Sequence, residues 1–254
     1  MLQGLYGSLD KDKPLIRVPF TNFAVGTVLL AFTGLIMCLA ISLMYHFQES
    51  TYTHCNVDNY LPSISASISL VPERYIWRCC IGLHSAPRYL VAVAYFSFYR
   101  SRFAKRLLDL LLSGLALICS LAENTGLLLL TYVASTETYS FHKNGFIVFI
   151  ISSLLHMLIT CRLWHVIKAY CVNPEEVTSY LWKVRLFLFN VSCCLAAAYF
   201  FRRHNKYCEP GIYTLFALCE YLVVLSNMAF HMTAFWDFGS KVVMVATLPE
   251  DKRY

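Results

Sequence analysis

The sequence predicts an all-α polytopic membrane protein, a bundle of six transmembrane helices with both termini on the cytoplasmic side. Hydrophobic residues make up 58% of the 254 residues and charged residues only 14%, with a mean hydropathy of +0.55. Apolar spans of about 20 residues, the length that crosses a bilayer as a helix, recur along the chain. Lys and Arg gather in alternate connections, as they do on the cytoplasmic side of membrane proteins. These observations exclude a soluble globular domain.

The six expected spans form a single transmembrane domain over residues 1–254. They cover about 20–46, 75–99, 107–133, 144–168, 183–201 and 211–236. The first span is expected to stay in the protein, because it is too long for a signal-peptide core and no small-residue cleavage pattern follows it. An even number of spans then puts both short tails on one side of the membrane.

The distribution of basic residues predicts which side that is. With the N-terminus inside, thirteen Lys and Arg residues fall in or beside cytoplasmic segments and five on the opposite side. The tails are therefore expected to be cytoplasmic and the loop 47–74 lumenal. The net charge of +6 reflects this topology and contact with an anionic leaflet. We expect no nucleic-acid partner, since no soluble segment carries a basic stripe with interleaved aromatic residues.

Two connections carry local signals. In the lumenal loop, serine alternates with apolar residues over 63–70, which fits a short strand, whereas the spacing of Ile64, Ile68 and Val71 fits an interfacial helical turn. Both interpretations stay open. In the cytoplasmic connection 172–179, the run Asn-Pro-Glu-Glu predicts a turn and a helix start.

The cysteines suggest one disulfide. Nine of the eleven fall in predicted helices or on the cytoplasmic side, where they act as small apolar residues. Cys55 lies in the first lumenal loop and Cys208 in the last, so an oxidising lumen favours a bridge between them. Two free thiols are the alternative.

Three polar residues share one stripe of the last span. Glu220, Asn227 and His231 are spaced seven and then four residues apart, so they project within about 40° of one another on a helix. An ionisable side chain at bilayer depth costs several kcal/mol unless it is paired or hydrated. This stripe therefore predicts a functional site that faces the bundle interior.

Other spans carry ionisable groups at a similar depth. Counted from the lumenal ends, His84, Glu123 and Glu220 all lie roughly 14 Å deep, at 1.5 Å per residue. His156 lies a little deeper, and Arg88 shares a helix face with His84. The sequence thus predicts a polar cavity near the lumenal leaflet. Simpler roles remain open, with Glu123 as a helix-packing residue and His156 as a hydrogen-bonded core histidine.

Familiar catalytic and metal motifs are missing from the sequence. It contains no His-Glu-x-x-His and no paired Cys-x-x-Cys, so no metal site is expected. It also lacks the Gly-x-Ser-x-Gly elbow of serine hydrolases. Five residues separate His231 from Asp237, so the His-x4-Asp spacing of glycerolipid acyltransferases is not met. Any chemistry must use the intramembrane groups.

Three segments carry a resemblance to a known family, THCNVDNYLPS, RYIWRCCIGLHSAPR and HNKYCEPGIYTLFALCEYLVVLSNMAFHMTAFWDF. They resemble the six-helix Frag1/DRAM/Sfk1 family, over nearly the whole chain, and within it the members that act on glycosylphosphatidylinositol (GPI) anchors. The resemblance implies a protein of the Golgi membrane, and in part the endoplasmic reticulum membrane, needed for fatty-acid remodelling of these anchors. After a lipase removes the unsaturated sn-2 chain, such a factor is required to reinstall a saturated one, typically stearoyl.

The resemblance also implies the partners. They are lyso-GPI-anchored proteins, an acyl-donor lipid and other membrane proteins of GPI remodelling. The donor is either a phospholipid or an acyl-CoA, and the sequence does not decide between them. No cofactor is expected beyond that donor. A phosphoinositol headgroup needs cations near the lumenal interface, for which Arg74, Arg78 and Arg88 are the candidates.

Our leading hypothesis is that the chain itself transfers the acyl group. We expect His231 or His84 to act as general base, Glu220 to orient that base, and Asn227 or Arg88 to stabilise the oxyanion. Glu123 and His156 are then expected to contact the substrate. The alternative is a non-enzymatic subunit that presents the lipid to a separate acyltransferase. The polar groups would then only bind the lyso-lipid or hold helices together.

Overall fold

The computed structural model describes residues 15–133, 137–169 and 173–245, so the predicted tails at 1–14 and 246–254 lie outside the described residues. Six long helices dominate this part of the chain. In chain order the elements are β1 (Ile16–Pro19), α2 (Phe20–Tyr45), α3 (Phe47–Thr51), α4 (Ile64–Ser67), α5 (Glu73–Arg102), α6 (Leu107–Tyr132), α7 (Tyr139–Ala169), α8 (Pro174–Tyr207), α9 (Ile212–Met232), α10 (Ala234–Asp237) and β2 (Val242–Val245).

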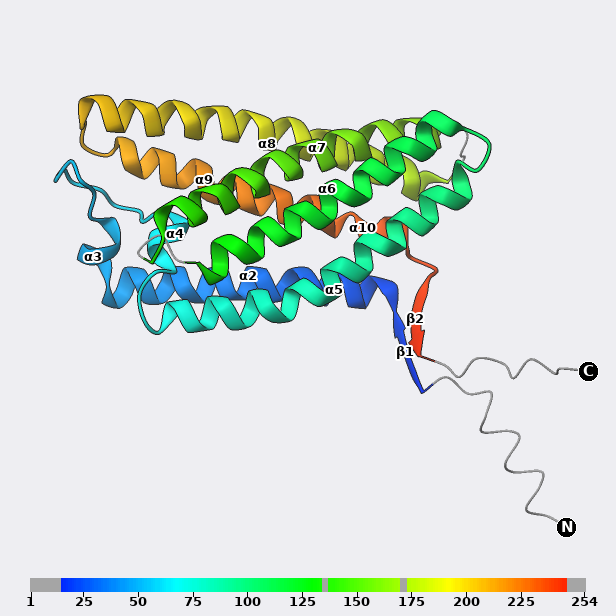
Figure 1. Ribbon diagram of the computed structural model, residues 1–254, viewed down its shortest axis with the longest axis horizontal. Helices are drawn as coiled ribbons and strands as arrows, with labels where there is room; N and C mark the ends of the chain where they lie inside the picture. Colours follow the sequence, from blue (N-terminus) through cyan, green and yellow to red (C-terminus); the bar gives the residue numbers. More distant parts are fainter. Residues whose placement is uncertain (1–14, 134–136, 170–172, 246–254) are drawn as a thin grey trace, which may run out of the picture.

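The long helices form an elongated antiparallel bundle (Figure 1). Helix α2 packs against α5, α5 against α6, α6 against α7, α7 against α8, and α8 against α9. Within the described residues, five helices have the length and mean hydropathy to cross a bilayer, Phe20–Tyr45, Leu107–Tyr132, Tyr139–Ala169, Pro174–Tyr207 and Ile212–Asp237. The chain is therefore a helical membrane protein, as predicted. Helix α5 is as long as these but carries several arginines, which lower its hydropathy.

Helices α6 and α7 pack closely because each carries a glycine where the two helices meet. A Cβ atom on Gly126 would lie 2.7 Å from the backbone nitrogen of Phe149, and one on Gly145 would lie 2.9 Å from that of Leu130. Only glycine allows the two backbones to approach this closely, as is common between membrane helices. This contact fixes the position of α6, which carries Glu123, against α7, which carries His156.

One end of the bundle is covered by the connection between α2 and α5; we call it the disulfide end. Cys55 in this connection is bonded to Cys208 at the end of α8, with 5.3 Å between their Cα atoms, which confirms the predicted bridge. Helix α4 is capped by Ser63, whose side chain accepts a hydrogen bond from the backbone nitrogen of Ala66. The helical interpretation of 63–70 is therefore correct and the strand interpretation is wrong.

The opposite end, which we call the strand end, carries a small sheet that was not predicted. Strand β1 pairs antiparallel with β2, with Ile16 opposite Val245 and Pro19 opposite Val242. This pairing joins the segment before the first long helix to the segment after the last, so both lie at the same end of the bundle (Figure 1). The all-α prediction needs this correction. Four-residue strands with exposed side chains carry too little hydrophobic alternation to be recognised in the sequence.

The predicted and observed helix ends differ most for α8. It begins at Pro174, nine residues before the expected start at 183, because Asn173 caps it by accepting a hydrogen bond from the backbone nitrogen of Glu175. It also runs six residues past the expected end at 201, to Tyr207. The Asn-Pro-Glu-Glu segment is thus the first turn of a long helix. As a result Lys183, expected at the cytoplasmic helix start, lies inside the bundle and is 1% exposed.

Candidate functional site

A buried carboxylate lies at the centre of the bundle. Glu123 on α6 is 0% exposed, and its Oε1 accepts a hydrogen bond from Nδ2 of Asn227 at 2.8 Å. The same oxygen lies 2.8 Å from Nη2 of Arg88 and 3.2 Å from Nε2 of His231. Asn227 also donates to Oγ of Ser153 on α7 at 2.7 Å. Side chains from α5, α6, α7 and α9 therefore meet at one carboxylate.

The contact between Arg88 and His231 fixes the proton on the histidine. Nη2 of Arg88 lies 2.6 Å from Nε2 of His231. A guanidinium can only donate, so Nε2 accepts, and the neutral ring carries its proton on Nδ1. Nε2 then has no proton to donate, so its 3.2 Å approach to Oε1 of Glu123 is not a hydrogen bond. His231 thus helps to hold Arg88 in place and has no free basic nitrogen.

His156 is arranged differently. Its Nδ1 lies 3.4 Å from Oε2 of Glu123, and neither atom has a hydrogen-bond partner among the described residues. Its ring stacks on that of His231, with 5.4 Å between centroids and 7° between planes. A proton on Nδ1, facing the carboxylate, leaves the lone pair on Nε2, which has no hydrogen-bond partner in the described part of the chain. This is the carboxylate–imidazole arrangement of a general base.

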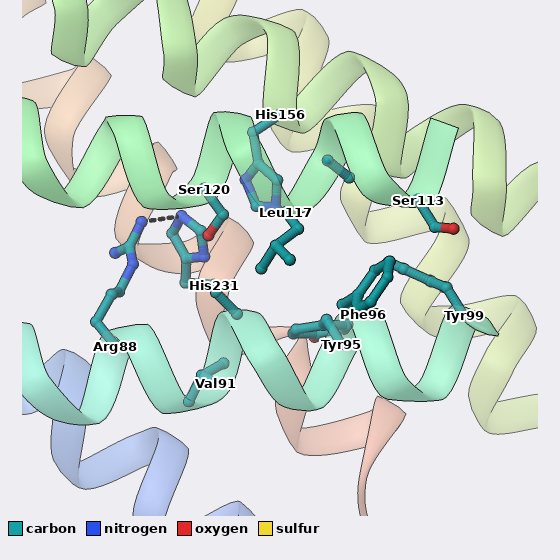
Figure 2. A pocket seen from close by; sticks show the side chains of 12 residues that line it. Arg88, Val91, Tyr95, Phe96, Tyr99, Ser113, Leu117, Ser120, His156 and His231 are labelled. Carbon is teal, nitrogen blue, oxygen red and sulfur yellow. Dashed lines mark hydrogen bonds between the residues drawn. The ribbon is translucent and has the colours of Figure 1, made fainter. Parts of the chain in front are cut away.

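The two histidines border a small hollow between α5 and α6, with a cavity volume of about 20 Å³. Figure 2 shows His156 and His231 directed into it from the side opposite Val91 and Tyr95. Arg88 also borders it, and its Nε and Nη1 have no hydrogen-bond partner among the described residues. Its other walls are mostly apolar, and the hollow runs from Arg88 toward the strand end.

The site therefore combines Arg88, Glu123, His156, Asn227 and His231, all of which the sequence had singled out. Their expected roles change. The carboxylate beside the histidines is Glu123 and not Glu220, because Glu123 alone contacts both rings. The arrangement can hold a neutral imidazole, a carboxylate behind it and free N–H donors around one apolar hollow, which are the components of acyl-group transfer.

Glu220 and His84 do not join this cluster. Oε2 of Glu220 accepts a hydrogen bond from the backbone nitrogen of Ile64, at 2.8 Å, and so holds the start of α4. Glu220 shares a stripe with Asn227 but is two turns away, about 10 Å along the axis. Nδ1 of His84 lies 2.7 Å from the carbonyl oxygen of Thr27 and ties α5 to α2. His84 therefore does not border the hollow.

The prediction of equal depth failed for Glu220 because the helix ends are not level. In contrast, α5 and α6 meet at the level of His84 and Glu123, where Asn124 donates to the carbonyl oxygen of Ser85. Helices α8 and α9 extend beyond the α6–α7 connection at the disulfide end (Figure 1). Equal counts from the ends of α6 and α9 therefore do not give equal heights in the bundle. Asn227 and His231 lie level with Glu123, whereas Glu220 lies level with α4.

The two other predicted headgroup contacts lie near the disulfide end. Arg78 donates to the carbonyl oxygen of Tyr132 at 2.9 Å and lies 3.2 Å from Glu137. Arg74 donates through Nε to the carbonyl oxygen of Ser69 at 2.9 Å. Ten residues of α5, about 15 Å, separate Arg78 from Arg88. Both arginines remain candidates for headgroup contact, at a distance from the hollow.

A second buried ion pair was not predicted from the sequence. Nζ of Lys183 lies 2.7 Å from Oδ2 of Asp237, both side chains being 1% exposed or less, and Tyr95 and Ser179 also donate to this carboxylate. It ties α5 and α8 to α10. The sequence contains a sign of this pair, because a lysine next to an apolar run needs a partner if its helix begins early enough to bury it. We regard this pair as a helix clamp.

Glu123, His156 and His231 could also be read as a metal site, since their ligand atoms all lie within 4.8 Å of one another. These are residue types that bind zinc. However, the guanidinium of Arg88 already contacts Oε1 of Glu123 and Nε2 of His231. A cation would have to displace this positive charge, so the geometry favours a hydrogen-bonded network.

Comparison with known proteins adds to this geometry. The sequence model described as the Frag1/DRAM/Sfk1/Cwh43P N-terminal domain matches residues 19–241. The chain is 64% identical to "Acyltransferase PGAP2" of Danio rerio, covering 84% of this chain and 92% of that one. It is 50% identical to "Acyltransferase PGAP2" of Xenopus tropicalis, over 94% and 95% of the two chains. It is 42% identical to "Post-GPI attachment to proteins factor 2" of Drosophila melanogaster, over 90% and 89%. No solved structure matches the chain.

Proposed function

The chain belongs to the Frag1/DRAM/Sfk1/Cwh43 family of membrane proteins, and from this premise we propose that it is an O-acyltransferase of GPI-anchor lipid remodelling. It reacylates the sn-2 position of lyso-GPI anchors with a saturated chain, typically stearoyl, so that the anchored proteins stay at the cell surface. One observation carries the proposal. Oε2 of Glu123 lies 3.4 Å from Nδ1 of His156 inside the bundle, beside a small hollow with mostly apolar walls.

Each group then has a role in the transfer. Nε2 of His156 takes the proton from the sn-2 hydroxyl while the hydroxyl oxygen attacks an acyl carbonyl. The carboxylate of Glu123 stabilises the imidazolium that forms. The free Nε and Nη1 of Arg88 donate to the oxyanion, and His231 and Asn227 keep Arg88 and Glu123 in position. In this assignment His156 takes the role of base that was expected of His231 or His84. Glu123 takes the orienting role that was expected of Glu220.

The proposed topology has six spans, with α5 as the sixth. Its Arg88 is compensated by Glu123 within the bundle, while Arg100 and Arg102 lie at its strand end. The excess of Lys and Arg at the strand end makes this end and both termini cytoplasmic. The disulfide end is then lumenal, as the oxidised Cys55–Cys208 pair requires. We assign the protein to the Golgi membrane and, in part, to the endoplasmic reticulum membrane.

The substrates follow from this orientation. The glycan of the lyso-GPI headgroup extends to the lumenal interface, near Arg74 and Arg78, while the glycerol sn-2 hydroxyl lies at Nε2 of His156. The donor is a phospholipid or an acyl-CoA. Other membrane proteins of GPI remodelling are candidate partners that supply the lyso-lipid.

Asn227→Ala tests this site in cells that lack the protein. It removes a donor to Glu123 without changing any charge, and misplacing the carboxylate by about 1 Å is expected to slow reacylation about 100-fold. Mass spectrometry of the anchors should then find mainly the single-chain form, and surface levels of GPI-anchored proteins should fall.

Glu220→Gln is the matched control for this experiment. The amide oxygen of glutamine can still accept from the backbone nitrogen of Ile64, so two-chain anchors should persist at equal protein level. Normal anchors with Asn227→Ala, or single-chain anchors with Glu220→Gln, would remove the Glu123 cluster from the mechanism.

A further inference from the structure

Ser120 on α6 has a hydroxyl that the fold does not use. The residue is 6% exposed and borders the hollow together with His156 and His231 (Figure 2). Its Oγ has no hydrogen-bond partner among the described residues. The atom is also not fully enclosed by the protein. It is a free hydroxyl that reaches the wall of the hollow.

Other hydroxyls of the same helix behave differently. Oγ of Ser113 donates to the carbonyl oxygen of Leu110 at 2.7 Å, and Oγ1 of Thr125 donates to that of Leu121 at 2.8 Å. Such bonds to the preceding turn are the usual way in which a helix satisfies serine and threonine away from water. Ser120 lacks one, so its hydroxyl is available to react.

Its position on α6 brings it to the base. Ser120 and Glu123 are three residues apart and therefore share a helix face, with Cβ atoms about 5–6 Å apart. Glu123 contacts the rings of both histidines. Ser120 and His156 border the same hollow, so a lipid ester that enters it would meet both the hydroxyl and the imidazole.

The side chains that line the hollow beside Ser120 are apolar. On α6, Leu117 and Ala116 follow Ser120 by one turn toward the strand end, and Val91, Ala92 and Phe96 of α5 form further apolar wall. An acyl chain bonded to Oγ of Ser120 would lie along these side chains, with its carbonyl beside Arg88 and His156. We propose that Ser120 is a nucleophile that carries the acyl group as an ester between donor and acceptor; this rests on the proposed acyltransferase function.

The two half-reactions balance without any further reactant. In the first, His156 takes the proton from Ser120, Oγ attacks the ester carbonyl of a donor lipid, and the donor C–O bond breaks. The imidazolium returns the proton to the leaving alkoxide, which gives a lyso-donor and acyl-Ser120. In the second, the sn-2 hydroxyl of the lyso-anchor loses its proton to His156 and attacks the acyl-serine carbonyl. Oγ leaves and recovers the proton.

Purified full-length protein in liposomes with a radiolabelled diacyl phospholipid and no acceptor tests the proposal. We expect label on the protein that survives denaturation, is released by alkaline hydroxylamine, and maps by tandem mass spectrometry to Ser120. Adding lyso-GPI should discharge it. Ser120→Ala should abolish labelling and lower acyl transfer by at least about 10³-fold. Ser120→Cys, which retains a nucleophile, should become labelled as a thioester that neutral hydroxylamine cleaves.

The matched control is Ser85→Ala. Ser85 is a buried serine of α5 that donates to the carbonyl oxygen of Ile81, and its substitution should leave labelling and transfer at the level of the unmodified protein. If Ser120→Ala transfers acyl chains at the rate of the unmodified protein, the acyl-serine is refuted while the acyltransferase function stands. If the unmodified protein transfers none, the function itself fails.

Discussion

His156→Gln is expected to lower the rate of acyl transfer by about 10²–10⁴-fold while the protein remains folded in the membrane. Glutamine keeps a polar side chain of similar length, but it cannot take a proton at neutral pH. The rate should be measured with purified protein in liposomes, per mole of protein that elutes as a single species in detergent.

His84→Gln separates this effect from the general loss of a buried histidine. His84 is 2% exposed and its Nδ1 contacts the carbonyl oxygen of Thr27, so we expect lower thermal stability and an unchanged rate per folded molecule. The opposite result, a silent His156→Gln and an inactive His84→Gln, would return the role of base to His84.

Arg88→Met is expected to prevent accumulation of folded protein. The substitution leaves the carboxylate of Glu123 buried without its guanidinium, and breaking a buried ion pair from one side typically costs about 3–5 kcal/mol. That cost is a large part of the stability of a typical protein domain. Size-exclusion chromatography and thermal unfolding of the detergent-solubilised protein would measure the loss.

The double substitution Arg88→Met with Glu123→Gln distinguishes structure from catalysis. It removes both charges, and the glutamine oxygen can still accept from Asn227, so the folded protein should recover to near the unmodified level. Acyl transfer should stay undetectable, since the orienting carboxylate and the oxyanion donor are both gone. An active double variant would mean that the pair only joins helices, and a fully stable Arg88→Met would mean that the two charges are not coupled.

Much of the fold could be read from hydropathy and cap signals. The span of α2 begins at the predicted residue, 20, and α6 at 107, because long apolar runs with clear boundaries determine them. The disulfide followed from loop position and compartment. The Asn173–Pro174 cap could in principle have predicted the early start of α8. The low hydropathy of the first turn instead put the expected start nine residues too late.

The polar site shows what helical periodicity in the sequence cannot predict. A spacing of seven and four residues correctly puts Glu220, Asn227 and His231 on one stripe, but a stripe does not specify which neighbour each residue meets. That depends on the relative heights of α6 and α9, and these follow from the extended disulfide ends of α8 and α9 (Figure 1). The carboxylate partner of His231 could therefore be identified as Glu123 only in three dimensions.

Reconstitution tests the central claim that this chain performs the acyl transfer itself. The purified protein is placed in liposomes that contain lyso-GPI and either a labelled diacyl phospholipid or labelled acyl-CoA, with no other protein. We expect labelled two-chain GPI from one of the donors with the unmodified protein, and none from either with His156→Gln. Absence of product from both donors with folded, unmodified protein would contradict the account and favour a subunit that presents the lipid to a separate acyltransferase.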